Sequence, residues 1–250
     1  MKVFKYLKAI IILLLIGSFA FASLLTGDEI LLKADEHRVV GDSFQMVIQV
    51  ENYTDNQLEG VTVMEGQINN GEMTMVNFLE PVNMKGRKII IEGEEMRLII
   101  PNVKNPIRIT ASQKLVGGIS YGDVAAMSYS SGYTAKMIGE ETVAGMNPDG
   151  TSSDKSHCYV LELVTKGKKV NYHKIILWVE QETFLPVKGD FFALSGKKMT
   201  TVYYTAPREW RGKTIITKMF LFDQINTTKY FSMEYSNFKA TQITDSTTDL

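Results

Sequence analysis

The sequence predicts a mainly β protein, a curled antiparallel half-barrel of about 11 strands wrapped over one or two helices. Apolar and polar residues alternate with a period of two in successive segments from Ser43 onward, which is typical of strands with one buried face. Turn signals such as Asn69-Asn70-Gly71 and Ser195-Gly196-Lys197 separate the segments and favour antiparallel hairpins between neighbours. Such a sheet buries its apolar face by curling or by splitting into two packed sheets, and we expect a curled sheet with helices in its mouth.

The first 22 residues have the composition of a signal peptide. The basic residues at its start are Lys2, Lys5 and Lys8. An uncharged run from Ala9 to Ile16 follows, and Ala20-Phe21-Ala22 offers the small residues of a cleavage site. We expect cleavage after Ala22, which leaves residues 23–250 as a single domain exported to the periplasm. A retained membrane anchor is the alternative, although the apolar stretch is short for a bilayer span.

The first element of the mature chain is predicted to be an amphipathic helix from Asp28 to Val39. One helical face carries three apolar side chains and an arginine, namely Ile30, Leu31, Ala34 and Arg38. The acidic residues Asp28 and Glu29 suit the positive end of the helix dipole. His37 lies near the end of this helix and is expected to be a partly exposed structural histidine.

The alternation predicts the strands one by one. The first strand begins at Ser43, and its apolar face consists of Phe44, Met46, Ile48 and Val50. Later strands are expected at Gly60–Ile68, Glu72–Phe78, Lys88–Glu92, Glu95–Ile100, Ile107–Thr110, Ala135–Glu141, His157–Thr165, Tyr172–Glu180, Pro186–Phe192, Lys198–Tyr204, Ile215–Phe222 and Lys229–Phe238. The segment from Gly145 to Ser156, rich in Gly, Asn, Pro, Asp and Ser, is expected to be a surface loop.

One segment interrupts the alternation midway. Gly117-Gly118 precedes the stretch 121–131, which predicts a loop and a short helix that cap the mouth of the sheet. We expect the segment from Lys114 to Ser131 to form a gate whose apolar side chains are Ile119, Tyr121, Val124 and Met127. A static crossover helix is an equally weighted alternative.

The composition argues against several classes of function. The 250 residues contain 27 Lys and Arg against 28 Asp and Glu, and no basic tract is long enough to follow a phosphate backbone, so nucleic acid is not an expected partner. The single cysteine, Cys158, is expected to be a core thiol, and His37, His157 and His173 are not spaced as a metal pair. The catalytic motifs GxSxG, HExxH and GxGxxG and the phosphate loop are absent. We therefore expect a protein that is not an enzyme and needs neither a cofactor nor a metal.

Several motifs resemble those of a known family. They are Phe78–Ile91, Met96–Pro101, Arg108–Gln113, Cys158–Leu163 and Tyr172–Val187, which are similar to "L-x-P-x-x-x-K-G", "M-W-x-Y-x-P", "R-R-I-x-x-S-x-R", "C-Y-x-L-E" and "Y-x-K-I-x-L-W-I-D-x-E-T-Y-L-P". The family is the outer-membrane lipoprotein-sorting, LolA-like group of exported proteins. The resemblance extends over nearly the whole mature chain, from about Asp28 to Ile243.

This resemblance implies a half-barrel with an apolar concave cavity that takes acyl chains. A protein of this kind acts as a transport chaperone, carrying lipoproteins or lipids through the periplasm towards the outer membrane. The partners it implies are the acyl chains of lipoproteins or phospholipids, an inner-membrane donor protein and an outer-membrane acceptor protein.

Two other functions compete with the carrier. The fold would also suit a non-catalytic accessory module of an envelope transporter that holds no lipid. A lipid hydrolase is the third alternative, because Asp154, Ser156 and His157 supply the residue types of a triad. Neighbours in one loop seldom make a working triad, however, since the base must be oriented by a distant group.

Strand phase identifies the side chains expected on the concave, lipid-binding face. Many are methionine or aromatic, which suits a surface that repacks around variable apolar ligands, although ordinary packing in a sealed core is the alternative. They are Phe44, Met46, Ile48, Val50, Met96, Leu98, Ile100, Phe231, Met233 and Tyr235.

Overall fold

The computed structural model describes residues 25–241, except 39, 40, 42, 71, 94, 117 and 168–170. The predicted signal peptide and its cleavage site lie outside the described residues. Within the described chain, no helix has the length and hydropathy needed to cross a bilayer.

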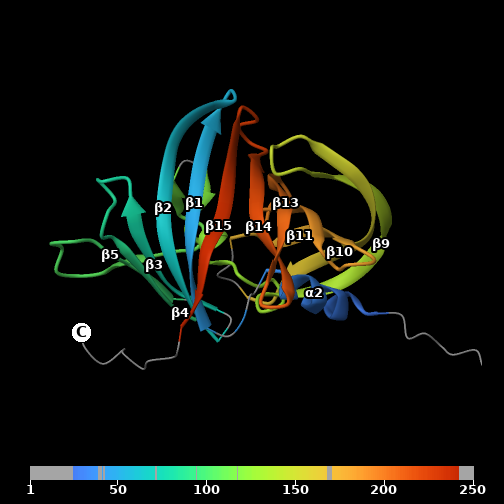
Figure 1. Ribbon diagram of the computed structural model, residues 1–250, viewed down its shortest axis with the longest axis horizontal. Helices are drawn as coiled ribbons and strands as arrows, with labels where there is room; N and C mark the ends of the chain where they lie inside the picture. Colours follow the sequence, from blue (N-terminus) through green and yellow to red (C-terminus); the bar gives the residue numbers. More distant parts are fainter. Residues whose placement is uncertain are drawn as a thin grey trace, which may run out of the picture.

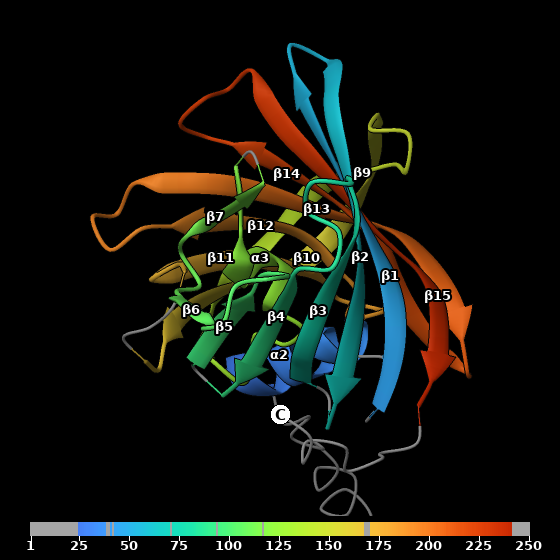
Figure 2. The ribbon, with the colours of Figure 1, turned by 90° about the vertical axis from the view of Figure 1, so that its left-hand side faces the viewer.

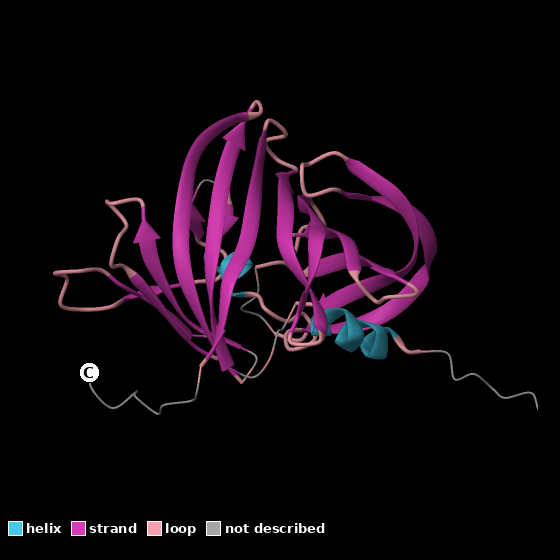
Figure 3. Cartoon of the chain, in the orientation of Figure 1, coloured by secondary structure: helices cyan, strands magenta, loops and turns pink. Residues whose placement is uncertain are grey.

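Strands dominate the structure, as Figure 3 shows. Two helices are described, α2 (Gly27–Glu36) and α3 (Tyr121–Ala125). The strands, labelled in Figure 1, are β1 (Ser43–Thr54), β2 (Gln57–Asn69), β3 (Glu72–Glu80), β4 (Lys88–Glu92), β5 (Glu95–Ile99), β6 (Ile107–Ile109), β7 (Lys114–Val116), β8 (Ile119–Ser120), β9 (Tyr133–Met146), β10 (Ser152–Thr165), β11 (Lys174–Glu180), β12 (Pro186–Phe192), β13 (Lys198–Trp210), β14 (Lys213–Asp223) and β15 (Lys229–Ala240).

One antiparallel sheet contains almost all of the strands. Its order is β6-β5-β4-β3-β2-β1-β15-β14-β13-β12-β11-β10-β9, so two meanders, β1–β6 and β9–β15, are joined where the first strand pairs with the last. Figure 2 shows the twist that accumulates across this sheet. The mainly β, open antiparallel sheet is confirmed, but it has 13 strands rather than about 11. The short edge strands β4, β5 and β6, which the alternation predicts, are among the 13 because each pairs with a neighbour.

The predicted loop between β9 and β10 was too long. The expected loop from Gly145 to Ser156 is mostly strand, since β9 and β10 leave a turn of only 147–151. The hairpin stays ordered because Asn147 and Thr151 bond to each other across the turn and Lys218 Nζ donates to the carbonyl oxygen of Pro148 at 3.0 Å.

Helix α2 begins at a capping box and ends earlier than predicted. Thr26 Oγ1 accepts from the backbone N–H of Glu29, whose carboxylate accepts from the backbone N–H of Thr26. The helix ends at Glu36 rather than Val39, and His37, its C-cap, bonds to β14 and to the turn after β11. Its two ring nitrogens lie 2.8 Å from the carbonyl oxygens of Thr214 and Thr183, and its own carbonyl accepts from Ile216 N–H. The expected half-buried, structural histidine is confirmed.

The main core lies on the concave face of the sheet. The predicted alternation in β1 is present, because Phe44, Met46, Ile48 and Val50 are each at most 2% exposed while the residues between them are half-buried. The buried face of α2, formed by Ile30, Leu31 and Ala34, joins the same core.

A second, smaller cluster lies on another part of the sheet. Cys158, Val160 and Trp178 pack together, and Trp178 Nε1 donates to Glu141 at 2.7 Å. Burial raises the pKa of the Cys158 thiol to about 12, with further contributions from Glu180 and Glu141. Cys158 is therefore a core thiol, as its place in the strand alternation predicts.

The burial of Cys158 leads to a first prediction, which concerns the reactivity of its thiol. A thiol-specific disulfide reagent at about pH 8 should leave the native protein unlabelled and should label one thiol per chain after denaturation, because the native thiol stays protonated and buried. Absorbance of the released chromophore measures the reaction. Rapid labelling without denaturant would contradict the buried, protonated state.

The pairing of β1 with β15 leads to a second prediction, which concerns the stability of the fold. Met233 of β15 is fully buried opposite Val50 of β1. Met233→Ala should lower the free energy of unfolding by about 2–5 kcal/mol. Urea unfolding followed by tryptophan fluorescence and by circular dichroism should give one coincident transition, since both meanders share one sheet. Ser236→Ala, at a half-buried position of the same strand, should change stability by less than about 0.5 kcal/mol. Two separate transitions would show that the meanders fold independently.

Candidate functional site

A cavity of about 480 Å³ lies on the concave side of the sheet. This volume is within the range of about 300–1,000 Å³ that is usual for small-molecule sites. We call it the concave cavity. Its sheet wall is mostly apolar and comes from both meanders: Met73, Ile91, Met96, Ile175, Phe191, Val202, Met219 and Leu221.

The opposite wall is formed by the chain between the two meanders. We call residues 118–133 the cover segment; it contains β8 and α3, and many of its residues line the cavity. Helix α3 begins at a capping box between Ser120 and Asp123, and Asn171 Nδ2 donates to both side chains, at 2.6 Å and 3.0 Å. A Cβ at Gly118 would come within 2.7 Å of the Phe231 ring, so glycine allows the cover segment to lie against β15.

The C-terminal end of α2 holds the cover segment in place. The Asp35 carboxylate accepts from the backbone N–H groups of Tyr129 and Ser130, at 2.9 Å and 2.7 Å. It also accepts from Ser128 Oγ at 2.9 Å. The carboxylate therefore fixes three consecutive residues of the cover.

Arg38 makes the second attachment. Its Nη2 donates to the carbonyl oxygen of Ala126 at 2.7 Å, and its guanidinium carbon lies 3.8 Å from the centre of the Tyr129 ring. Nη1 is buried 3.8 Å from Asp35 Oδ1 and makes no hydrogen bond within the described structure. Arg38 lines the concave cavity and also a small pocket of about 10 Å³ behind the cover.

Buried phenols surround this attachment. The hydroxyls of Tyr129 and Tyr204 lie 2.6 Å apart, and Tyr133 donates to the carbonyl oxygen of Tyr172 at 2.8 Å. Burial raises the pKa of all four phenols above the ordinary value, so they stay neutral at physiological pH. Tyr129, Tyr133 and Tyr172 line the cavity and add neutral aromatic surface to it, beside the charged side chain of Arg38.

The cavity reaches the surface at one end. Glu72, Gly93, Ser131 and Lys166 line it and are themselves exposed, so they form its mouth. Glu72 begins β3 and Gly93 follows β4, which places the mouth at one end of these strands.

Of the residues predicted to bind lipid, two line a cavity or pocket and the others lie in the core. Met96 lines the concave cavity and Tyr235 lines the small pocket. Leu98 and Ile100 belong to the same core as these two, Leu98 at 8% exposure and Ile100 partly buried. The remaining six are at most 3% exposed within the packed core: Phe44, Met46, Ile48, Val50, Phe231 and Met233. Their contact with a ligand stays a prediction.

The residues predicted for the gate all lie in the cover segment. Met127 lines the cavity, Ile119 and Val124 are 1% exposed, and Tyr121 is half-buried against the core. Neither the attachment of the cover segment by Asp35 and Arg38 nor the wall contributed by β11–β14 was predicted from the sequence. A signal for the attachment was present, because Arg38 places a charge on the apolar face of the predicted helix.

The residues proposed for a hydrolase have other partners. His157 Nδ1 lies 2.8 Å from Thr142 Oγ1 on the neighbouring strand, and within the described structure no hydrogen bond joins its side chain to that of Asp154 or Ser156. Among the described residues, no three His, Cys, Asp or Glu side chains are grouped so that they could hold a metal ion.

Comparisons with solved structures agree on the fold. A LolA superfamily protein from Nitrosomonas europaea is 27% identical, with a TM-score of 0.75 over 88% of this chain and 96% of its own. A DUF1329 family protein from Desulfovibrio piger and an outer membrane lipoprotein-sorting protein domain from Vibrio parahaemolyticus are each 16% identical, with TM-scores of 0.72 and 0.71 over 88% of this chain and 94% of theirs. No curated protein matches the chain.

A family model whose description is "Uncharacterized protein" matches residues 70–247, which is more than half of the chain. The chain belongs to that family, and the LolA-like resemblance that its sequence motifs predict is confirmed.

Proposed function

We propose that this protein is a periplasmic carrier that holds the acyl chains of lipoproteins or lipids in the concave cavity and moves them towards the outer membrane. The observation that carries the proposal is a mostly apolar cavity, closed on one side by a segment that is attached through a few polar bonds. The fold supports it, since one protein of similar fold is described as an outer membrane lipoprotein-sorting domain. The predicted signal peptide agrees with a periplasmic location.

The chemistry of the wall fits this task. Burial of a methylene group contributes about 0.8 kcal/mol, so an acyl chain binds through apolar contact alone and needs no titrating group. Methionines at three positions of the sheet wall, Met73, Met96 and Met219, are unbranched and adapt to chains of different length. A carrier of this type takes its cargo from an inner-membrane donor protein and passes it to an outer-membrane acceptor protein.

The cover segment is the proposed gate. Its polar attachment is concentrated at Asp35 and Arg38, and these groups would all bind water once the segment moves away. Within the described structure Arg38 Nη1 is buried without a hydrogen bond, so the closed attachment is not fully satisfied. A protein that must release its cargo requires one segment that opens at a lower free energy than the rest of the fold, and this segment would be the cover.

Filling the cavity should prevent binding. Val202 of β13 is 4% exposed and lines the concave cavity, so the larger side chain in Val202→Phe occupies space that a ligand would use. The affinity for a fluorescent fatty-acyl probe should fall at least about tenfold, because apolar contact supplies the binding energy. Probe titration measures the change, and circular dichroism checks the fold.

Val164→Phe is the matched control, because Val164 of β10 is 39% exposed. It should bind the probe as the unchanged protein does. A folded Val202→Phe variant with normal uptake would contradict the proposed site. A folded, unchanged protein that takes up no acyl probe would favour the accessory-module alternative.

Asp35→Asn should weaken the attachment of the cover segment to α2. The asparagine amide has a single acceptor oxygen, and its NH₂ group cannot accept a hydrogen bond from the backbone N–H groups that bond to the Asp35 carboxylate. Hydrogen exchange at the amides of Tyr129 and Ser130 should accelerate at least about tenfold, as expected when hydrogen bonds to a charged group are lost. Bound probe should also dissociate faster.

Asp28→Asn provides the control on the same helix, since Asp28 Oδ1 accepts from Ala135 N–H at 2.7 Å and makes no bond to residues 126–130 in the described structure. Its exchange at Tyr129 and Ser130 should stay unchanged. If a bound acyl ligand gives residues 118–131 no additional protection, the static crossover replaces the gate.

A further inference from the structure

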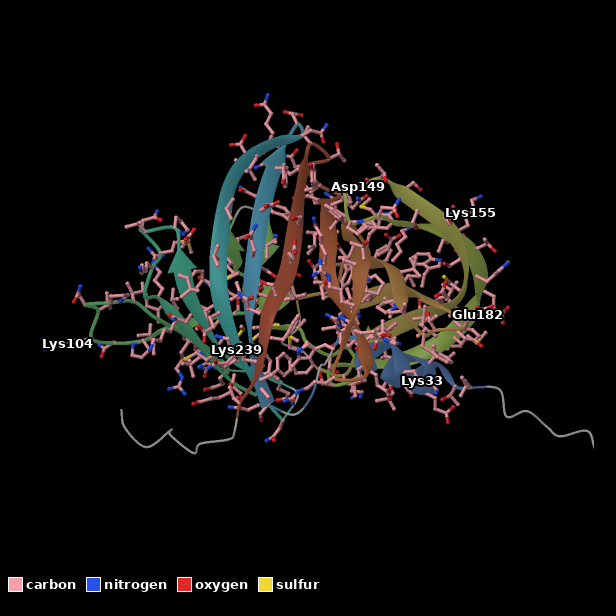
Figure 4. All side chains as sticks on the ribbon, viewed as in Figure 1. Lys33, Lys104, Asp149, Lys155, Glu182 and Lys239 are labelled. Carbon is pink, nitrogen blue, oxygen red and sulfur yellow. The ribbon has the colours of Figure 1, made fainter. Side chains whose placement is uncertain are left out.

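Two neighbouring loops expose apolar side chains at the end of β3–β6 opposite the mouth. They are the β3–β4 loop, 81–87, and the β5–β6 loop, 100–106, and together we call them the tip. Val82 is 89% exposed and Val103 is 48% exposed. The tip projects on the left of Figure 1, and Lys104 marks its outer limit in Figure 4.

Hydrogen bonds within the β3–β4 loop keep it compact. Met84 N–H and Lys85 N–H donate to the carbonyl oxygen of Pro81, while Gly86 N–H donates to that of Phe78. The two loops also touch, because a Cβ at Gly86 would lie 3.2 Å from Pro101 Cγ. Val82 is thus held outward by a shaped loop, so little conformational entropy is lost when it meets another surface.

Basic residues lie in the same two loops as these valines. The tip and the first residue of β4 carry Lys85, Arg87, Lys88 and Lys104, and none of the four pairs with a carboxylate among the described residues. Glu80, at the end of β3, is the acidic residue on this side. At the opposite end of the same strands, Glu92 pairs with Arg97 and Glu95 pairs with Arg108, while Glu72 adds a further carboxylate. The excess of basic side chains on these strands therefore lies at the end with the exposed valines.

We propose that the tip docks on an anionic lipid bilayer. Lysine and arginine side chains near a membrane are attracted by anionic headgroups, and exposed apolar side chains enter the boundary between headgroups and acyl chains. Val82 and Val103 supply the apolar part, and the four basic residues supply the attraction. Because β3 runs from the mouth at Glu72 to the tip at Glu80, a docked molecule keeps its mouth on the side away from the bilayer, open to a protein partner. This inference does not depend on what the cavity holds.

Vesicle cosedimentation tests the proposal with the chain from Ser23 onward, which keeps every described residue. The protein should sediment with vesicles that contain phosphatidylglycerol and stay in solution with pure phosphatidylcholine, and salt at about 0.5 M should weaken the binding. Val82→Asp, and separately Lys85→Glu with Lys104→Glu, should each lower the partition coefficient at least about tenfold.

The β12–β13 turn supplies matched controls, because Leu194 is 78% exposed and Lys197 is also exposed. Leu194→Asp and Lys197→Glu should bind vesicles as the unchanged protein does. Tip variants that bind normally, controls that lose binding equally, or equal binding to neutral vesicles would each overturn the proposal. Tip variants that bind vesicles normally but lose a protein partner would assign the surface to that protein instead.

Discussion

The pairing of the first strand with the last is the constraint on which the structure depends. β1 and β15 pair along nearly their whole length, and this contact turns two meanders into one sheet. In the part of the chain that the structure describes, neither half contains a helix large enough to cover its apolar face. By joining them, the pairing creates one continuous concave surface, with Ile48 and Val50 of β1 facing the same core as Met233 of β15.

A sheet of this size has more concave surface than the remaining chain covers. Helix α2 has ten residues, and α3, within the cover segment, has five. The cavity is the part of that surface left without side chains to fill it, and its wall therefore comes from strands of both meanders. Asp35 and Arg38 attach the cover segment at the C-terminal end of α2. The rest of α2 can therefore stay packed on the sheet if the cover segment moves.

Much of the fold follows from local sequence pattern. All the strands expected from the alternation are present, because one buried face imposes a period of two on each. The strand order is not a local property: the register between Ile48 and Tyr235 joins residues that are far apart in the chain, and no hairpin signal encodes it. Cavity residues such as Val202 and Phe191 have the same pattern as sealed core residues such as Leu161, since alternation identifies the buried face but not whether another side chain fills the space above it.

Native mass spectrometry of the protein isolated from the cells that make it tests the central claim most directly. If the concave cavity carries acyl chains, the mass should exceed that of the mature chain by one lipid or lipoprotein, and gentle activation should release a species with acyl chains. The added mass should be absent from the Val202→Phe variant, whose cavity is filled. A wild-type protein that is isolated folded and with no added mass, under conditions that preserve other lipid complexes, would contradict the account.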